Sequence, residues 1–523
     1  MEIPSQANRQ IARAAGTVMA AFVLSNIVGL IRQILVSNAF GTSFELDAYN
    51  AASTYPDLIF SLVAGGALAS AFVPTLTGFL TKGDRQDGWF LSSAITNIIF
   101  VVLSLLSLIS FILAPQIVAT ILAPKYPLEL QALTTALLRI LLIAPTIFGV
   151  SGLMMGILNA HQVFIWPALA PSMLWLGMII GVLFLAPSMG IFGLAWGYVL
   201  GAVLHLGIQL PAVFRLPARK YFATFGLRFQ AVREVGRLMG PRLLGVAAVQ
   251  INFVVNTILA TGMMIGSLTA LKYAWAIMTM PQVVIAQSIA IAALPTFSAQ
   301  IATGKLADMR GSLAATLRGV IILSLPATLG LILLREPVIA MLFQRGAFDA
   351  HSTELVSWAL LWYSIGLLGH GVVEILSRAF YAMHDTKTPV FVGIGAMSLN
   401  VVFSLIFAAV FQQIGWLPFG GLAFANTLAT ALEMFALWLL MRKRLHGLEG
   451  REIWDGFAKA LVATAVMCLV ITGWLIYAEQ FPEWLIASGG VLLGAFSYCV
   501  VILLLRAKEA TIIWNFFAGK FGG

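Results

Sequence analysis

Long apolar runs are the feature that most limits what this 523-residue chain can fold into. A bilayer core of about 30 Å requires roughly 20 apolar residues in one helix, and the chain holds fourteen candidate runs of that kind. Charged residues make up only 10% of the sequence and hydrophobic residues 60%, whereas an ordinary soluble domain carries about 25% charged residues. The sequence therefore predicts an all-α polytopic membrane protein, and it excludes a soluble enzyme, a disulfide-stabilised secreted domain and a disordered tail.

The fourteen expected transmembrane helices cover most of the chain. The second, eighth and tenth are longer than a bilayer requires, which predicts tilt, a kink or a turn that projects beyond the bilayer. Pro56 and Pro281 are the expected break points in the second and the eighth. The expected spans are 12–37, 47–79, 89–113, 131–159, 164–186, 190–214, 238–262, 267–299, 312–334, 354–383, 388–411, 418–441, 457–478 and 484–506.

The basic residues indicate how the chain is oriented, because cytoplasmic loops of membrane proteins carry an excess of Lys and Arg. Fourteen spans place both termini on one side, and 20 of the 30 basic residues fall on that side. We therefore expect both termini in the cytoplasm. The basic residues are scattered over short loops and do not form one basic face, so the net charge of +9 does not indicate nucleic-acid binding.

Three landmarks recur along the chain at nearly the same offset. AFVPTL around Pro74 is followed 221 residues later by AALPTF around Pro295, and the loop ending at Pro167 is followed 222 residues later by one ending at Pro389. A Gly-Leu-Ala sequence also recurs, 228 residues apart. Helices 1–6 and 7–12 are thus expected to be two pseudo-symmetric six-helix lobes around a central cavity, the architecture of an alternating-access transporter.

These expectations divide the chain into four parts. They are an N-lobe of helices 1–6 (1–214), a basic cytoplasmic linker (215–237), a C-lobe of helices 7–12 (238–443), and helices 13 and 14 with a cytoplasmic tail (444–523).

Charged residues inside spans are costly and are usually paired or functional. Glu374 and Arg378 are four residues apart and can pair on one helix face, so mutual neutralisation and substrate contact are both open. Arg32 and Asp47 flank a short connection, where Arg32 can pair with Asp47 or hold a phosphate or carboxylate by two parallel hydrogen bonds. The charges singled out are Arg32, Asp47, Asp57, Arg139, Arg242, Lys272, Glu374, Arg378 and Glu433.

No catalytic constellation, phosphate-binding glycine loop or Cys/His metal spacing occurs in the sequence, so we expect a protein that is not an enzyme. Because nothing in the chain is suited to hydrolyse ATP, the work of transport must come from an ion gradient, the membrane potential or the substrate gradient.

Several strings resemble the MurJ (MviN) family of lipid II flippases, within the multidrug/oligosaccharidyl-lipid/polysaccharide exporter superfamily. They are VGLIRQILVSNAFGTSFELDAYNAA, GGALASAFVP, GVSGLMMGILNAHQVFIWPALAPSMLWLGMII, MLFQRGAFDAHSTE and LSRAFYAMHDTKTP, and the resemblance covers essentially the whole chain. It implies export of a lipid-linked peptidoglycan precursor across the bacterial plasma membrane by alternating access. It also implies a cationic cavity for the diphosphate, a groove for the lipid tail by helices 13 and 14, and contacts with cell-wall synthesis proteins and membrane lipids.

The resemblance also implies site residues. Arg32 matches the family's cavity arginine late in helix 1 and Asp47 its acidic residue at the start of helix 2, whereas other family arginines fall on Asn26, on Phe60 or Ser61, and on Ala276. Lys272 lies one turn from Ala276 and Arg242 opens the adjacent helix, which predicts that the cationic function has moved to them. The substrate-binding residues expected are Arg32, Asp47, Asn26, Lys272, Arg242, Glu374 and Arg378.

Sodium ligands of some family members map near Asn256, Asn400 and Asn426. Amide oxygens can coordinate a hard cation, but without a carboxylate such a site is weak, and coupling to sodium or to the membrane potential stays open. Two alternatives to lipid II transport also stay open. One is export of another polyprenyl-diphosphate glycan or an amphipathic drug, and the other is a membrane scaffold that transports nothing.

Overall fold

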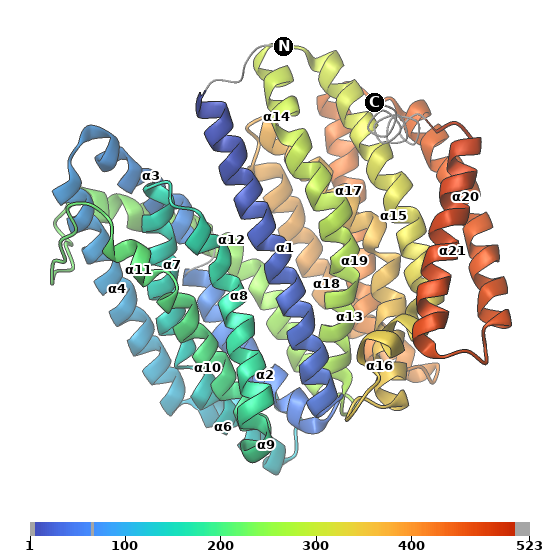
Figure 1. Cartoon of the computed structure of the whole chain (residues 1–523), viewed down its shortest axis with the longest axis horizontal. Helices are drawn as coiled ribbons and strands as arrows, with labels where there is room; N and C mark the ends of the chain where they lie inside the picture. Colours follow the sequence, from blue (N-terminus) through green and yellow to red (C-terminus); the bar gives the residue numbers. More distant parts are fainter. Residues whose placement is uncertain (1–5, 64–66, 508–523) are drawn as a thin grey trace. The chain divides into compact units, whose positions relative to one another are not determined.

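The structure is a computed structural model that describes the backbone of residues 6–63 and 67–507. Residues 1–5, 64–66 and 508–523 lie outside the described part, as do the side chains of 6–20, 22, 63, 67–70, 240–245, 248 and 249. Within the described residues every regular element is a helix (Figure 1). This confirms the all-α polytopic fold.

The contacts within the chain divide it into two compact units, Met1–Gly266 with Arg345–Phe348, and Ser267–Gln344 with Asp349–Gly523. The division places the seventh predicted helix with the first unit. The four-part division and the repeat remain predictions.

The first unit contains helices α1 to α12. Two short π-helical segments, Val118–Leu122 and Gly181–Leu185, follow α5 and α8. The α-helices are α1 (Gln6–Phe40), α2 (Phe44–Val63), α3 (Ala67–Lys82), α4 (Arg85–Ile112), α5 (Ala114–Ile117), α6 (Leu128–Leu141), α7 (Ala144–Ala160), α8 (Ile165–Ile180), α9 (Ala186–Met189), α10 (Ile191–Gly207), α11 (Leu210–Phe214) and α12 (Gln230–Thr261).

Glycines bring α8 and α10 into close contact. A Cβ on Gly177 would lie 2.2 Å from the Cα of Gly201, and one on Gly181 would lie 2.5 Å from the Cα of Gly197. Glycines four residues apart on each helix thus let the two backbones touch, which is the small-residue packing typical of membrane helices. This contact holds α8 in place, and α8 carries a side chain of the candidate site.

The second unit contains helices α13 to α21, with a π-helical segment at Val283–Gln287. The α-helices are α13 (Ser267–Gln282), α14 (Ser288–Ala302), α15 (Leu306–Phe343), α16 (Ala350–Ile365), α17 (Leu367–Ala382), α18 (Lys387–Gln413), α19 (Phe419–Arg444), α20 (Gly450–Tyr477) and α21 (Glu483–Leu504).

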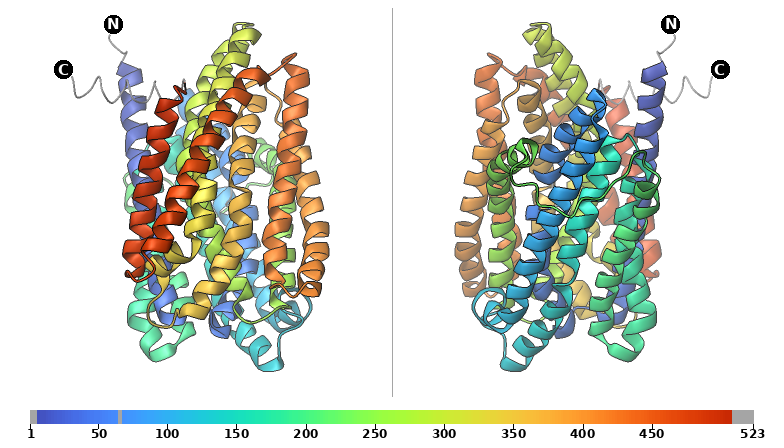
Figure 2. Two further views of the ribbon diagram at one scale, coloured as in Figure 1. Left: turned by 90° about the vertical axis from the view of Figure 1, so that its right-hand side faces the viewer. Right: turned by 90° about the vertical axis from the view of Figure 1, so that its left-hand side faces the viewer.

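The 38-residue helix α15 organises the second unit. Its buried side chains, among them Leu317, pack with Phe297 of α14 and Phe380 of α17 in one apolar cluster. Helices α20 and α21, drawn in red in Figure 2, form a second cluster with α15, and the Tyr498 hydroxyl of α21 donates to the Ile322 carbonyl at 2.6 Å. The two helices outside the predicted repeat are therefore packed onto this long helix.

Eleven of the described helices or helix combinations are long and apolar enough to cross a membrane, and the pair α16 and α17, bent by 44°, is a twelfth if it counts as one span. These twelve coincide with twelve of the predicted spans. The other two predictions fall on α2 with α3, where residues 64–66 are undescribed, and on α12, which is not among the eleven. The count of fourteen therefore stays a prediction.

The prolines behave differently from each other. Pro281 lies in the last turn of α13, directly before the π-helical segment Val283–Gln287, so the regular α-helix is interrupted beside it as expected. Pro56 lies inside α2, which continues through it to Val63, so the break expected at Pro56 is absent.

Candidate functional site

Arg32 lies on α1 in the first unit, and its guanidinium stacks on the Trp175 ring of α8, 4.7 Å from the ring centroid. The side chain is half-buried. Gly29, one turn earlier on α1, leaves room for the indole, since a Cβ there would lie 3.3 Å from the Trp175 Nε1. The contact with the ring helps to hold the guanidinium in place, and a guanidinium is the group suited to binding a phosphate or carboxylate by two parallel hydrogen bonds.

Asp47, in the first turn of α2, is only 3% exposed. Its Oδ2 accepts a hydrogen bond from the backbone N–H of Gly266 at 2.6 Å. Gly266 has a φ of +89°, a conformation that glycine adopts without strain. The buried carboxylate thus fixes the end of the connection that follows α12, and this contact gives Asp47 a positioning role.

The remaining site residues of the first unit are more scattered. Asn26 is exposed on α1, and the side chain of Arg242 lies outside the described part of α12. Asp57 on α2, which we singled out without assigning it to the site, accepts a hydrogen bond from the Tyr198 hydroxyl of α10 at 2.8 Å. Neither Trp175 nor Tyr198 was anticipated, because nothing in their sequence spacing connects them to α1 or α2.

The string LFQRGAF supplies a strap to the first unit, namely Arg345–Phe348. The Ala347 N–H donates to the Asn38 carbonyl at 2.9 Å. Two glycines allow this approach: a Cβ on Gly41 would lie 2.2 Å from the Ala347 carbonyl oxygen, and a Cβ on Gly346 would lie 2.4 Å from the Asn38 carbonyl oxygen. The strap therefore covers the end of α1, two turns beyond Arg32.

In the second unit Glu374 and Arg378 pair on α17, as their spacing predicts, with an N–O distance of 2.8 Å. Both side chains are more than a quarter exposed, so the pair is accessible while its net charge is zero. Lys272 is half-buried on α13. The Glu433 carboxylate of α19 lies against the backbone of Gly393 on α18, since a Cβ on that glycine would be 3.4 Å from Oε1.

A polar group on α17 and α19 was not predicted as a unit. The His370 Nε2 lies 3.2 Å from the Asn426 Oδ1 and 3.4 Å from the Thr430 hydroxyl. The rings of Trp275 and His370 pack in a T-shaped arrangement, with centroids 5.6 Å apart. His370 also stands one turn before Glu374, so α17 presents three polar side chains at intervals of four residues. That interval was the available sequence signal.

The amides mapped as sodium ligands have hydrogen-bond partners within the protein, and the sodium site stays a prediction. The Asn400 Oδ1 accepts from the Ser404 hydroxyl at 3.1 Å, and the Asn426 Oδ1 is bonded to His370. Asn256 donates to the Asn252 Oδ1 at 3.1 Å and belongs to the other unit. Among the described residues no cluster of three or more His, Cys, Asp or Glu has the arrangement of a metal site.

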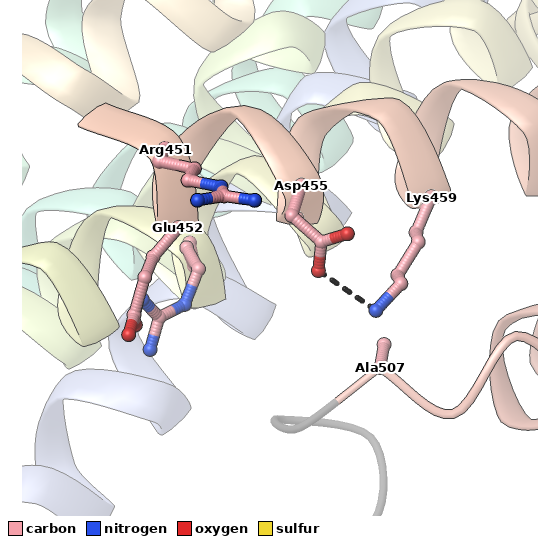
Figure 3. Close-up of a pocket in the computed structure, with 7 residues that line it drawn as sticks. Arg451, Glu452, Asp455, Lys459 and Ala507 are labelled. Atoms are coloured by element: carbon pink, nitrogen blue, oxygen red, sulfur yellow. Dashed lines mark hydrogen bonds and ion pairs between the residues drawn. The ribbon is translucent and has the colours of Figure 1, made fainter. Parts of the chain in front are cut away.

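A cavity of about 320 Å³ opens at the start of α20, and no predicted site residue lines it (Figure 3). Two ion pairs occupy its wall, Arg318 with Glu452 and Asp455 with Lys459. Arg318 lies within the ninth predicted span and is 8% exposed, and it is an intramembrane charge beyond those singled out from the sequence. Its partner lies 134 residues away.

Comparisons with known proteins agree over nearly the whole chain. The family model described as "Lipid II flippase MurJ" matches residues 36–493. A protein of Burkholderia cenocepacia named "Lipid II flippase MurJ" is 29% identical over 470 residues, 88% of this chain and 89% of that protein. A "Probable lipid II flippase MurJ" of Vibrio cholerae is 28% identical over 521 residues, 96% of this chain and 97% of its own length.

Solved structures give the same result for the fold. The chain is similar to "Lipid II flippase MurJ, inward closed conformation", with a TM-score of 0.79 and 25% identity over 92% of this chain and 97% of that one. It also resembles an inward-facing multidrug resistance transporter of the MATE family, with a TM-score of 0.68 and 17% identity over 82% of this chain and 96% of that one. At that identity the second likeness concerns the fold alone.

Proposed function

This chain belongs to the lipid II flippase MurJ family, and on that premise we propose that it moves lipid II from the inner to the outer leaflet of the bacterial plasma membrane by alternating access. The family match over residues 36–493 is the observation that carries the proposal. The chain is a multi-pass membrane transporter and not an enzyme. The transported substrate is a lipid-linked precursor that is delivered for cell-wall synthesis.

The chemical task is to carry a charged diphosphate past hydrocarbon. A charged group cannot be left unpaired in an apolar medium, where it costs many kcal/mol, whereas the polyprenyl tail can stay in lipid. The protein must therefore replace the water around the diphosphate with donors of its own. Arginine is suited to this because its planar guanidinium donates two parallel hydrogen bonds to one phosphate group.

In the first unit we assign the diphosphate contact to Arg32. The Trp175 ring centroid lies 4.7 Å from the guanidinium carbon, and this cation–π contact helps to hold the side chain in place before substrate arrives. Asp47 acts through position, because its buried carboxylate is directed to the Gly266 N–H. Asn26 remains a proposed neutral contact on the same helix, and Arg242 a proposed cation of α12.

In the second unit we assign the substrate cation to Lys272 on α13. Arg378 is 2.8 Å from Glu374, so this pair offers hydrogen bonds to sugar or peptide groups while adding no net charge. No step of transport is assigned to sodium, since two of the three candidate amide oxygens are held by Ser404 and His370.

The positive-inside distribution supports both termini in the cytoplasm. Contacts with cell-wall synthesis proteins and with membrane lipids belong to the same proposal, since the product is consumed at the outer surface.

Complementation tests the proposal. The chain is expressed in bacteria depleted of their own lipid II flippase, beside Arg32→Ala, Arg32→Lys and the control Arg139→Ala, at matched membrane levels. Arg139 is a suitable control because it also lies over an aromatic ring, that of Phe111 at 5.2 Å, at the end of α6.

We expect growth with the parent chain and the control and loss of growth with Arg32→Ala. Arg32→Lys keeps the charge without the planar fork and should restore growth only in part. Failure of a correctly inserted parent chain to restore growth would contradict lipid II transport, and equal growth of all variants would contradict the role of Arg32.

A further inference from the structure

The segment between α11 and α12 is strapped along α4, within the first unit. The Asn97 amide of α4 donates to the carbonyls of Phe222 and Thr224, at 3.0 and 2.8 Å, and accepts from the Tyr221 hydroxyl at 2.7 Å. The Ser93 hydroxyl of α4 accepts the Phe222 N–H at 3.2 Å. In the right-hand view of Figure 2 this segment, in green, crosses the face of α4.

Aromatic and backbone contacts extend the attachment in both directions. The Trp89 indole donates to the Pro217 carbonyl at 3.3 Å, and Phe90 packs edge-on against Phe222 and Phe229, with centroids 5.4 and 5.2 Å apart. Segment 217–229 is therefore fixed along the second to fourth turns of α4, and in this subsection the strap means this segment and not Arg345–Phe348.

Burial alternates along the strap with the period of an extended chain. Phe222, Thr224 and Gly226 face α4 and are only partly exposed. The residues that alternate with them are exposed: Phe225 is 47% and Leu227 65% exposed, and Tyr221 is 68% exposed although its hydroxyl bonds to Asn97. Phe214, at the end of α11, is 59% exposed. Several exposed apolar side chains in one stretch are not what a loop in water requires.

Basic residues are concentrated in the same part of the sequence as these exposed apolar side chains. Between residues 214 and 240 the sequence holds six basic residues and one acidic residue. Arg219 lies over the Phe214 ring at 4.7 Å and Lys220 over the Phe222 ring at 5.2 Å, so two of the charges are held directly beside aromatic groups. The six are Arg215, Arg219, Lys220, Arg228, Arg233 and Arg237.

The exposure of the α4 side chains indicates how far the strap reaches toward the membrane interior. From Gly88 to Ile99 no side chain of α4 is exposed, whereas from Phe100 onward the helix presents a row of exposed apolar side chains that ends at Ile112, 63% exposed. The exposed stretch is suited to lipid tails. The strap ends where that stretch begins, and Asn97 satisfies its deepest carbonyls, as irregular backbone at the edge of hydrocarbon requires.

We propose that segment 214–229 is an interfacial anchor, which inserts Phe214, Tyr221, Phe225 and Leu227 at the boundary of the acyl chains and binds anionic phospholipid headgroups through the surrounding Arg and Lys. The alternation supplies the apolar face, and the charge excess selects anionic over neutral lipid. The proposed anchor depends on the proposed function in one respect only, the orientation of the chain, which places the anchor at the cytoplasmic leaflet.

Lipid contact is measured on the full chain in nanodiscs, with Cys468 and Cys499 replaced by Ala and a single reporter at Phe225→Cys carrying an environment-sensitive fluorophore. The control reporter is Gly83→Cys, in the connection between α3 and α4, where an added Cβ meets no atom within 4 Å. Headgroup-labelled nitroxide lipid should quench the fluorophore at 225 and aqueous iodide should not, with the reverse at 83. Equal quenching by iodide at both positions would overturn the proposal.

The charge requirement is measured by titrating phosphatidylglycerol into phosphatidylcholine nanodiscs. In Arg215→Gln/Arg219→Gln/Lys220→Gln, half-maximal protection from iodide should need more anionic lipid, since each cation near the surface contributes about fivefold to attachment. The matched control is Lys305→Gln/Arg442→Gln/Lys443→Gln, which removes three exposed charges from the second unit.

A shift in the strap variant alone supports recognition of anionic headgroups, and equal curves for both variants contradict it. Because the signal is lipid contact, a loss of lipid II transport in any of these variants bears on the proposed function and not on the anchor.

Discussion

Gly41→Ala should detach the strap Arg345–Phe348 from the end of α1. Gly41 has a φ of +57°, and a Cβ there would lie 2.2 Å from the Ala347 carbonyl oxygen and 2.9 Å from its carbonyl carbon. Both neighbours are backbone atoms, so no side chain can rotate away to make room. The strap must move, and with it the hydrogen bond from the Ala347 N–H to the Asn38 carbonyl.

The size of the effect has two parts. A left-handed conformation costs a non-glycine residue about 1–2 kcal/mol, and the lost hydrogen bond costs about 1 kcal/mol more. Gly83→Ala separates them, because Gly83 has a φ of +84° with nothing within 4 Å of its Cβ position. That control carries the backbone strain without the collision.

Hydrogen exchange at Ala347 measures the detachment directly. A local loss of about 2–3 kcal/mol corresponds to exchange that is roughly 30- to 150-fold faster in Gly41→Ala than in the parent chain, with no change in Gly83→Ala. Unchanged protection of Ala347 in Gly41→Ala would refute the reasoning, as would equal acceleration in the control.

Three further outcomes follow from single contacts. Thr388→Val removes the hydroxyl whose hydrogen bond is the largest cause of the lowered pKa of Asp385, a group in the connection between α17 and α18. Because folding lowers the pKa of Asp385, the parent chain should have a higher melting temperature than the variant above about pH 4. The difference in melting temperature should disappear as the pH falls through the folded-state pKa, and a difference that grows in acid would contradict this. Ser151→Ala removes the buried hydroxyl that is 2.7 Å from both His205 and Gln209, and thermal unfolding should show a loss of about 1–3 kcal/mol. The control Ser488→Ala removes only an exposed hydrogen bond within one helix, to the Trp484 carbonyl, and should cost almost nothing. Trp175→Leu should weaken lipid II binding by the roughly 2- to 30-fold that a cation–π contact of about 0.5–2 kcal/mol represents, while Trp175→Phe retains most of it; equal binding by both variants would exclude the stack.

Hydropathy could predict most of the fold, because the thickness of the bilayer fixes the length of a spanning helix independently of its neighbours. The exceptions are local. The length of the run 354–383 predicted tilt, a kink or a turn beyond the bilayer, and the run is two helices bent by 44°, but hydropathy did not place the bend at Gly366. The helix was expected to break at Pro56, yet neighbouring turns carry α2 past it to Val63.

Contacts of the candidate site could be predicted from the sequence only where both residues lie on one helix. The Glu374–Arg378 pair follows from i,i+4 geometry and is present. The contacts of Arg32 with Trp175 and of Asp47 with Gly266 depend on how distant helices approach each other, and the second joins residues 219 positions apart. Helical periodicity carries no information about such approaches. The buried Arg318 shows the same limit, since Glu452 lies on another helix.

The most direct test of the account is leaflet-to-leaflet movement of lipid II by the purified chain reconstituted in vesicles, measured for the parent, Arg32→Ala and Arg139→Ala. We predict that the parent and Arg139→Ala make inner-leaflet lipid II accessible outside the vesicle, whereas Arg32→Ala does so no faster than protein-free vesicles. Movement of lipid II by Arg32→Ala at the parent rate, or its absence with a folded parent chain, would contradict the account.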